Sequence, residues 1–121
     1  MRDYRDDSAQ LSLWPRGADA GVRETVCSAP SITTVCLQSG SNGNCTYVET
    51  ADTKLLVDAG ITAAQVQRRL RALGKDPGEL DAVLLTHDHA DHARHVGVYH
   101  RKLGLPVFAT AGCIASVERT G

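Results

Sequence analysis

The segment of residues 87–92 concentrates side chains that bind metal ions. Its sequence, "HDHADH", contains three histidines and two aspartates. Residues two apart in an extended segment point to the same side, so His87 and His89 can converge on one ion. Asp91 and His92 are adjacent, project in other directions, and could reach a second ion. Imidazole with carboxylate suits zinc, and also iron or manganese, so the pattern H-x-H-x-D-H predicts metal binding through these four residues.

The position of this cluster supports the prediction. It follows "DAVLLT", residues 81–86, a nearly continuous apolar run of the length expected for a strand buried on both faces. Ligand sites in open α/β sheets form at the carboxyl ends of strands. The alternative is that Asp91 only caps the next helix and that the histidines are surface residues. One histidine would fit that interpretation, but three of them behind a buried strand favour a site.

The elements that position the cluster are predicted from residue 31 onward as an α/β chain with a mixed sheet. Thr62 and Gln65 match a capping box, and Gly74 is placed to end the helix that they begin. Asp52 and Thr53 are expected to form a tight hairpin turn. Strands are expected at 31–38, 45–50, 54–57, 81–86 and 106–110, and helices at 62–73, 93–103 and 111–119.

The remaining composition sets limits on the chain. Residues 1–30 show no sustained period and are expected to be a poorly ordered lead-in to one partial domain, residues 31–121. No secretory signal, membrane span or C-x-x-C pair is recognisable, so we expect a cytoplasmic chain with reduced thiols and no membrane partner. The net charge of −1 gives no global basic field. A nucleic-acid partner is therefore neither indicated nor excluded by charge.

Several stretches resemble one family. "THDHADH" after "DAVLL" resembles the signature of metallo-β-lactamase fold metallohydrolases, and "LLVDAG" at 55–60 resembles an earlier motif whose aspartate would be Asp58. "SGSNGNCTYVE" at 39–49 and "HVGVYHRKLGLPVFAT" at 95–110 resemble the YycJ-like branch, described as exonucleases. The resemblance covers about residues 32–117.

This resemblance implies an αββα sandwich and hydrolysis by two divalent metal ions, zinc first, with manganese or iron as alternatives. His87 and His89 would hold one ion, and Asp91 and His92 the other. Asp91 would also act catalytically in proton transfer, and Asp58 would orient a ligand histidine. A bound divalent metal lowers the pKa of its water to roughly 7, which makes a nucleophile at neutral pH.

The ligand count predicts an incomplete site. Two catalytic metals need about six ligand positions, and the family takes the remainder from a later histidine, aspartate and histidine. Here the later histidines are His95 and His100, inside the next predicted helix, and no aspartate follows Asp91. We therefore expect the N-terminal half of the sandwich, truncated and inactive alone. Its sheet would need the missing half or a self-associating partner.

Three functions remain open for the parent protein or the chain. The leading prediction is a phosphodiesterase of exonuclease type acting on nucleic acid. A thioester or lactam hydrolase and a non-catalytic metal-binding module are the alternatives. Backbone N–H groups of residues 40–44 could bind a phosphate or form a plain turn. A basic group could contact a nucleic-acid backbone, although a solvated helix face is favoured; its members are Arg68, Arg69, Arg71 and Lys75.

Overall fold

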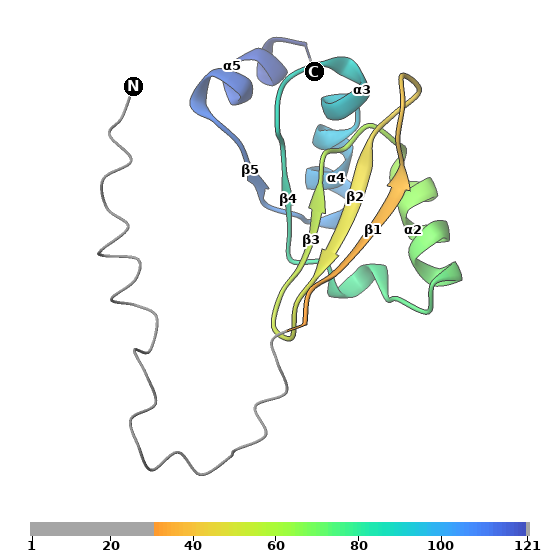
Figure 1. Ribbon diagram of the computed structural model, residues 1–121. Coiled ribbons are helices and arrows are strands. Elements are labelled where there is room, and N and C mark those ends of the chain that lie inside the picture. Colours follow the sequence, from red (N-terminus) through yellow and green to blue (C-terminus); the bar gives the residue numbers. More distant parts are fainter. Residues whose placement is uncertain (1–30, 121) are drawn as a thin grey trace, which may run out of the picture.

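A computed structural model describes residues 31–120, and the predicted lead-in at 1–30 lies outside this part (Figure 1). A five-stranded sheet has the strand order β1-β2-β3-β4-β5. The strands are β1 (Thr33–Gln38), β2 (Cys45–Glu49), β3 (Lys54–Val57), β4 (Ala82–Leu84) and β5 (Val107–Phe108). The helices are α2 (Ala63–Ala72), α3 (Ala90–Ala93), α4 (Val96–Leu103), α5 (Ala111–Thr120) and a 3₁₀ turn (Pro77–Glu79).

The sheet is mixed, as the sequence predicts. β1, β2 and β3 form an antiparallel meander, whereas β3, β4 and β5 are parallel. The hairpin turn between β2 and β3 lies one residue earlier than predicted. Thr50 N–H donates to Thr53 C=O at 2.8 Å, so Ala51 and Asp52 form the tip. The Thr50 hydroxyl fixes this register because it accepts the N–H groups of Asp52 and Thr53.

Helix α2 begins and ends where the sequence predicts. The Thr62 side chain accepts from Gln65 N–H at 3.1 Å, while the Gln65 side chain accepts from Thr62 N–H at 2.9 Å. This capping box satisfies two N–H groups that would otherwise lack partners. Gly74 has φ +72° and ends the helix. Val66 and Leu70 are fully buried, which places the apolar stripe of the helix against the sheet.

The helix predicted over 93–103 is instead two helices, α3 and α4, and the prediction was wrong at its start. In a continuous helix the Asp91 carbonyl would accept from His95 N–H. Here it accepts from Asn44 N–H at 2.7 Å, and His95 N–H donates to Ala59 C=O at 2.9 Å. The carbonyl of His92 accepts from Ala59 N–H at 2.6 Å. These long-range bonds replace the helical ladder and break the helix.

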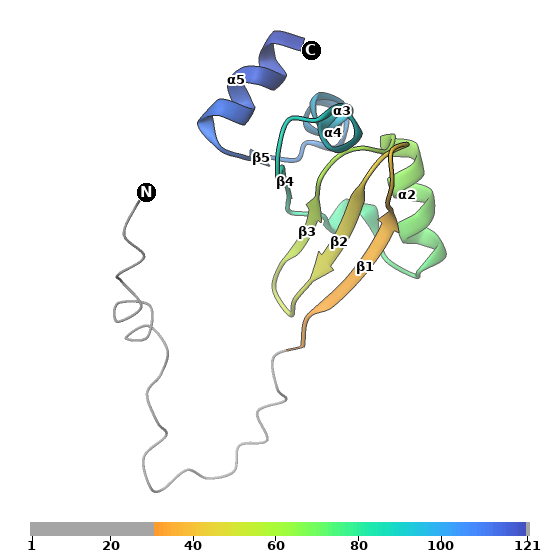
Figure 2. The same ribbon diagram turned by 45° about the horizontal axis from the view of Figure 1, so that its top comes forward.

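One face of the sheet is covered and the other is open. The covered face carries Leu37, Tyr47, Leu56 and Val83, which pack in one core cluster with residues of α2 and α4; α4 lies behind the strands in Figure 1, and Figure 2 shows the same arrangement from another angle. Strand alternation turns the neighbouring residues to the opposite face. Two rows cross that face: Thr34, Val48, Leu55 and Ala82, and Cys36, Thr46, Val57, Leu84 and Phe108.

The helices of the described residues include none long and apolar enough to cross a membrane.

Candidate metal centre

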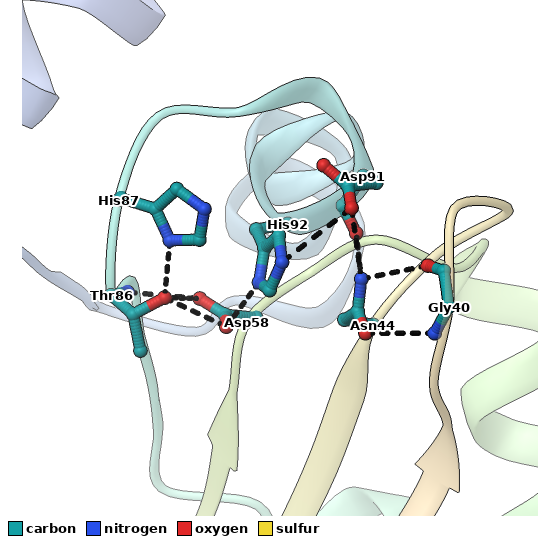
Figure 3. A network of polar contacts seen from close by, with 7 residues as sticks. All are labelled: Gly40, Asn44, Asp58, Thr86, His87, Asp91 and His92. Carbon is teal, nitrogen blue, oxygen red and sulfur yellow. Dashed lines mark hydrogen bonds and ion pairs between the residues drawn. The ribbon is translucent and has the colours of Figure 1, made fainter.

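The Asp58 carboxylate lies at the centre of the candidate site, directly after β3 (Figure 3). Its side chain is only 8% exposed. Oδ1 accepts from Thr86 N–H at 2.8 Å, and the Thr86 hydroxyl lies 2.9 Å from both carboxylate oxygens. His92 Nδ1 lies 2.6 Å from Oδ2. Asp58 therefore ties the end of β3 to the loop after β4 and to α3.

The three histidines of the motif gather around this carboxylate. The ring of His87 lies 4.6 Å from that of His89 and 4.1 Å from that of His92, measured between centroids. His87 Nδ1 lies 2.8 Å from the Thr86 hydroxyl oxygen. His89 is exposed, while His87 and His92 are half-buried. The loop after β4 thus brings the three imidazoles to one edge of the sheet, as the sequence predicts for a strand end.

Asp91 is held by the loop that joins β1 to β2. Asn44 Nδ2 donates to Asp91 Oδ2 at 3.1 Å and to the Asp91 carbonyl at 3.3 Å. Asn44 also closes its own loop, because Nδ2 donates to the Gly40 carbonyl at 2.8 Å and Oδ1 accepts from Gly40 N–H at 3.0 Å. His92 Nε2 lies 3.6 Å from Asp91 Oδ2. The carboxylate is therefore oriented toward the histidine cluster.

Gly60 allows three segments, here called the three loops, to meet: residues 40–44, residues 58–60 and the segment that carries Asp91. A Cβ at Gly60 would lie 1.9 Å from the Asp91 carbonyl oxygen and 2.3 Å from Asn44 N. Both neighbours are backbone atoms fixed by hydrogen bonds, and Gly60 N–H donates to the Asn44 carbonyl at 2.9 Å. Only glycine fits such a close approach of backbone to backbone. The "LLVDAG" stretch therefore supplies both the central carboxylate and the space beside it.

The donor types fit a zinc-like cation, since imidazole nitrogens and carboxylate oxygens are its usual ligands in proteins. Within residues 31–120, however, no three His, Cys, Asp or Glu side chains converge closely enough to hold an ion. The predicted ligands share one edge without forming a closed cage. Assignment of His87, His89, Asp91 and His92 as metal ligands stays a prediction, as does the catalytic role of Asp91 and Asp58.

Asp88, which stands between the first two histidines, takes part in a different contact. A hydrogen bond with Ser116 of α5 lowers the pKa of the Asp88 carboxyl, and His89 and His87 add smaller effects in the same direction. Asp88 therefore connects the motif loop to α5.

The later histidines lie in the helical segment after the motif. His95 N–H is bonded to Ala59, and partial burial, followed by the charge of Arg94, lowers the pKa of the His95 imidazole. His100 Nδ1 lies 2.9 Å from the Leu105 carbonyl oxygen, so this ring secures the end of α4. The structure thus gives His100 a structural contact outside the cluster.

Two of the four basic residues considered for nucleic-acid contact are engaged within the chain. The Arg69 guanidinium donates to the Leu37 carbonyl and to Gln38 Oε1. Lys75 Nζ lies 2.8 Å from Glu49 Oε2. Both contacts fasten α2 and its following turn to the first strands. Arg68 and Arg71 are exposed on α2.

Sequence reasoning did not single out Thr86 or Gly60 as site residues, and it considered Asn44 only for its backbone N–H and not for its side chain. Thr86 could have been found from its place directly before His87, where a hydroxyl follows a buried strand. Asn44 and Gly60 make their contacts with Asp91 across long sequence separations, and no local pattern reveals them.

The comparisons with known proteins agree with this geometry. The metallo-beta-lactamase superfamily matches residues 39–112, a span that includes Asn44, Asp58 and the whole histidine motif. Structures of that class align with the chain as well. A metallo-beta-lactamase of Cronobacter sakazakii is 24% identical with a TM-score of 0.59, covering 66% of this chain and 33% of that one. The metallo-beta-lactamase SMB-1 is 27% identical with a TM-score of 0.58, covering 69% and 33%.

The chain belongs to the metallo-beta-lactamase superfamily, and its mixed sheet with flanking helices is part of that fold. Among curated relatives it is similar to two exodeoxyribonucleases. WalJ of Streptococcus pneumoniae D39 is 47% identical over 84 residues, 69% of this chain and 31% of that protein. YycJ of Bacillus anthracis is 41% identical over 73 residues, 60% and 28%. The chain spans about a third of the length of these relatives.

Proposed function

We propose that this chain carries part of the metal site of a hydrolase that cleaves phosphodiester bonds in DNA. The observation that supports this most is the 47% identity over 84 residues with an exodeoxyribonuclease. The span matched by the superfamily contains the polar edge built by Asp58, Thr86, His87, Asp91 and His92. In this proposal the activity belongs to a protein that contains more than this chain, because the matched residues cover only 31% of that relative.

In this proposal His87 and His89 would hold one divalent metal ion, and Asp91 and His92 would hold a second. When bound, such ions supply a water of lowered pKa, roughly 7, and polarise the phosphoryl oxygen. Asp91 Oδ2 accepts from Asn44 and lies 3.6 Å from His92 Nε2, so Asn44 would hold this carboxylate beside its partner ligand. Asp58 orients His92 through Nδ1. The remaining metal ligands come from outside the chain.

The open face of the sheet supports a further part of this proposal. Its two rows include Val48, Leu55, Val57, Leu84 and the exposed Phe108, which is 57% exposed. Contiguous apolar surface of this kind marks an interaction site. We assign it to the rest of the hydrolase fold or, when the chain is alone, to a second copy.

The test is an assay of the protein encoded by the complete gene, with zinc or manganese added. End-labelled single- and double-stranded DNA, RNA, a thioester and a β-lactam serve as substrates. The proposal expects stepwise shortening of DNA from an end, and loss of that activity in the His87→Ala, His89→Ala double variant. His100→Ala is the matched control because its ring bonds Leu105 outside the cluster. Hydrolysis of the thioester or lactam without DNA cleavage would favour the alternative class.

A further inference from the structure

We propose that Thr86 is a positioning residue that extends the influence of Asp58 to His87. Through Thr86, one buried carboxylate fixes the ring tautomer of two histidines, His87 and His92, and leaves Nε2 as the nitrogen without a hydrogen in both rings. Nε2 of His92 lies 3.6 Å from Asp91 Oδ2, beyond hydrogen-bond distance. The inference deepens the proposed function, since it concerns two of the predicted metal ligands. It can be tested on the metal-free chain, without any measurement of activity.

The Thr86 hydroxyl carries a single proton, which can be donated to only one partner. Its oxygen lies 2.9 Å from both oxygens of Asp58 and 2.8 Å from His87 Nδ1. An ionised carboxylate only accepts hydrogen bonds, so two short oxygen–oxygen contacts require the hydroxyl proton to lie between Thr86 and Asp58. The Thr86 hydroxyl then has no further proton to donate, so its oxygen can only accept a hydrogen bond from the His87 imidazole. His87 must therefore carry its hydrogen on Nδ1, as inferred from the network of partners.

The position of the ring hydrogen of His92 follows in the same way, but from a direct contact with Asp58. Its Nδ1 lies 2.6 Å from Asp58 Oδ2, and a carboxylate at that distance needs a proton from the ring. His92 thus also carries its hydrogen on Nδ1. Thr86 N–H supplies a further donor to Oδ1, so every contact made by Asp58 in this network comes from a donor. A carboxylate that is 8% exposed and accepts several hydrogen bonds is a strong anchor for these donors.

The hydrogen on Nδ1 determines what the opposite ring nitrogen, Nε2, can bind. A neutral imidazole with its hydrogen on Nδ1 has its lone pair on Nε2, and this lone pair is what binds a metal. The rings of His87 and His92 lie 4.1 Å apart, yet they belong to the two different halves of the H-x-H-x-D-H motif. Asp58 therefore prepares one ligand for each predicted ion, directly for His92 and through Thr86 for His87 (Figure 3).

Thr86 suits this relay because of where it stands. Asp58 N–H donates to the Leu84 carbonyl at 2.7 Å, which aligns the end of β3 with the end of β4 two residues before Thr86. The Thr86 backbone and side chain then bind the same carboxylate oxygen, Oδ1. Thr86 is exposed, and its N–H and hydroxyl hold it to Asp58 at two points.

The experiment is nitrogen-15 NMR of the labelled chain with a chelator present. Spectra that correlate ring carbon-bound protons with both ring nitrogens distinguish the two tautomers. They are recorded at about pH 8.5, well above the ordinary histidine pKa of about 6.5. His100 is an internal reference, because its Nδ1 must donate to the Leu105 carbonyl at 2.9 Å independently of Asp58.

In the unmodified chain we expect His87, His92 and His100 all to show the Nδ1–H pattern. In Thr86→Val, His87 alone changes to the Nε2–H form that free imidazole prefers, while His92 and His100 keep theirs. Thr86→Ser restores His87 because it restores the hydroxyl. An Nε2–H pattern for His87 in the unmodified chain overturns the inference even if Thr86→Val fails to fold. An unchanged His87 in folded Thr86→Val overturns it as well. Failure of the DNA assay would leave these spectra unaffected.

Discussion

Asp58 combines an unusual backbone with an unusual side-chain environment. Its φ is +67°, and within residues 31–120 it is the only residue other than glycine with a positive φ. Residues other than glycine occupy this region at a cost of roughly 1–3 kcal/mol, although aspartate tolerates it better than most. The turn directs the carboxylate back toward Thr86 and His92. Such local strain persists where surrounding contacts impose it, and here the hydrogen bonds of the site do so.

The metal assignment leads to a prediction for the first histidine pair. Replacing His87 and His89 by alanine removes two imidazoles from the same side of the loop. We expect the protein from the complete gene to lose about one bound metal ion per chain, since each catalytic zinc depends on about three protein ligands. Metal content after dialysis, measured by elemental analysis, checks this. His100→Ala should retain the full content, and unchanged metal in the double variant would remove the assignment.

Gly60 provides a prediction about the framework of the site. In Gly60→Ala the new methyl group would overlap the Asp91 carbonyl oxygen and Asn44 N, and neither can move without breaking a backbone hydrogen bond. Overpacking of this kind costs about 1–3 kcal/mol or more of unfolding free energy. Urea unfolding followed by circular dichroism measures the loss.

Gly112→Ala is the matched control for that variant. A Cβ at Gly112 meets nothing within 4 Å, and the residue lies in α5. Alanine in a helix is favoured over glycine by up to about 1 kcal/mol. Gly112→Ala should therefore be neutral or slightly stabilising. Equal stability of Gly60→Ala and the unmodified chain would show that the three loops are not locked together as described.

At the scale of elements, strands β1 to β4 and helix α2 follow from local patterns in the sequence. The capping box at Thr62 and the glycine at Gly74 define α2 because their effects act within a few residues. The break between α3 and α4 could not be predicted in this way. It depends on bonds from Asn44 and Ala59, which lie far away in sequence and compete with the helical ladder. Local periodicity contains no information about such competitors.

The residues of the candidate site could likewise be predicted only where a local sequence pattern reveals them. The histidine motif and Asp58 were identified because the residue types and their spacing are visible in one short stretch each. The contact of Asn44 with Asp91 joins residues 47 apart, and Gly60 matters only once the loops have met. Thr86 can be seen in the sequence directly before the motif, but its hydrogen-bonding role can be inferred only from the distances in the structure. Tertiary contacts therefore explain what the sequence alone did not reveal.

Strand β2 offers a prediction about reactivity. Burial raises the pKa of the Cys45 thiol to about 12, partly offset by a hydrogen bond with Tyr99. Alkylation requires the thiolate, so a raised pKa keeps Cys45 neutral and unreactive at pH 8. Cys36, on the adjacent strand, is exposed. Brief iodoacetamide treatment and peptide mass spectrometry should find Cys36 modified and Cys45 unmodified. In urea the two should react alike, and rapid labelling of Cys45 without denaturant would contradict its burial in β2.

At the scale of the molecule, the two faces of the sheet have different roles. The covered face forms one core cluster with residues of α2 and α4. The open face consists of paired residues from every strand, several of them apolar and half-buried. The site lies at the edge between these two faces. Whatever packs on the open face would therefore also approach the histidine cluster, which fits a site completed by residues outside this chain.

The open face should govern self-association of the isolated chain. Val48 and Leu55 are paired neighbours in one row, on the half of the strands away from Asp58. Replacing both by lysine places two like charges where apolar contact is proposed, and exposed apolar patches of this kind drive association. We expect the unmodified chain to form dimers or larger species in sedimentation velocity and to bind a hydrophobic dye. The Val48→Lys, Leu55→Lys variant should be monomeric and bind less dye.

Ala64→Lys with Ala72→Lys adds the same charge on exposed positions of α2 and should leave association unchanged. If both double variants weaken association equally, net charge and not this face is responsible, and a monomeric unmodified chain that binds no dye would show that the face is already covered.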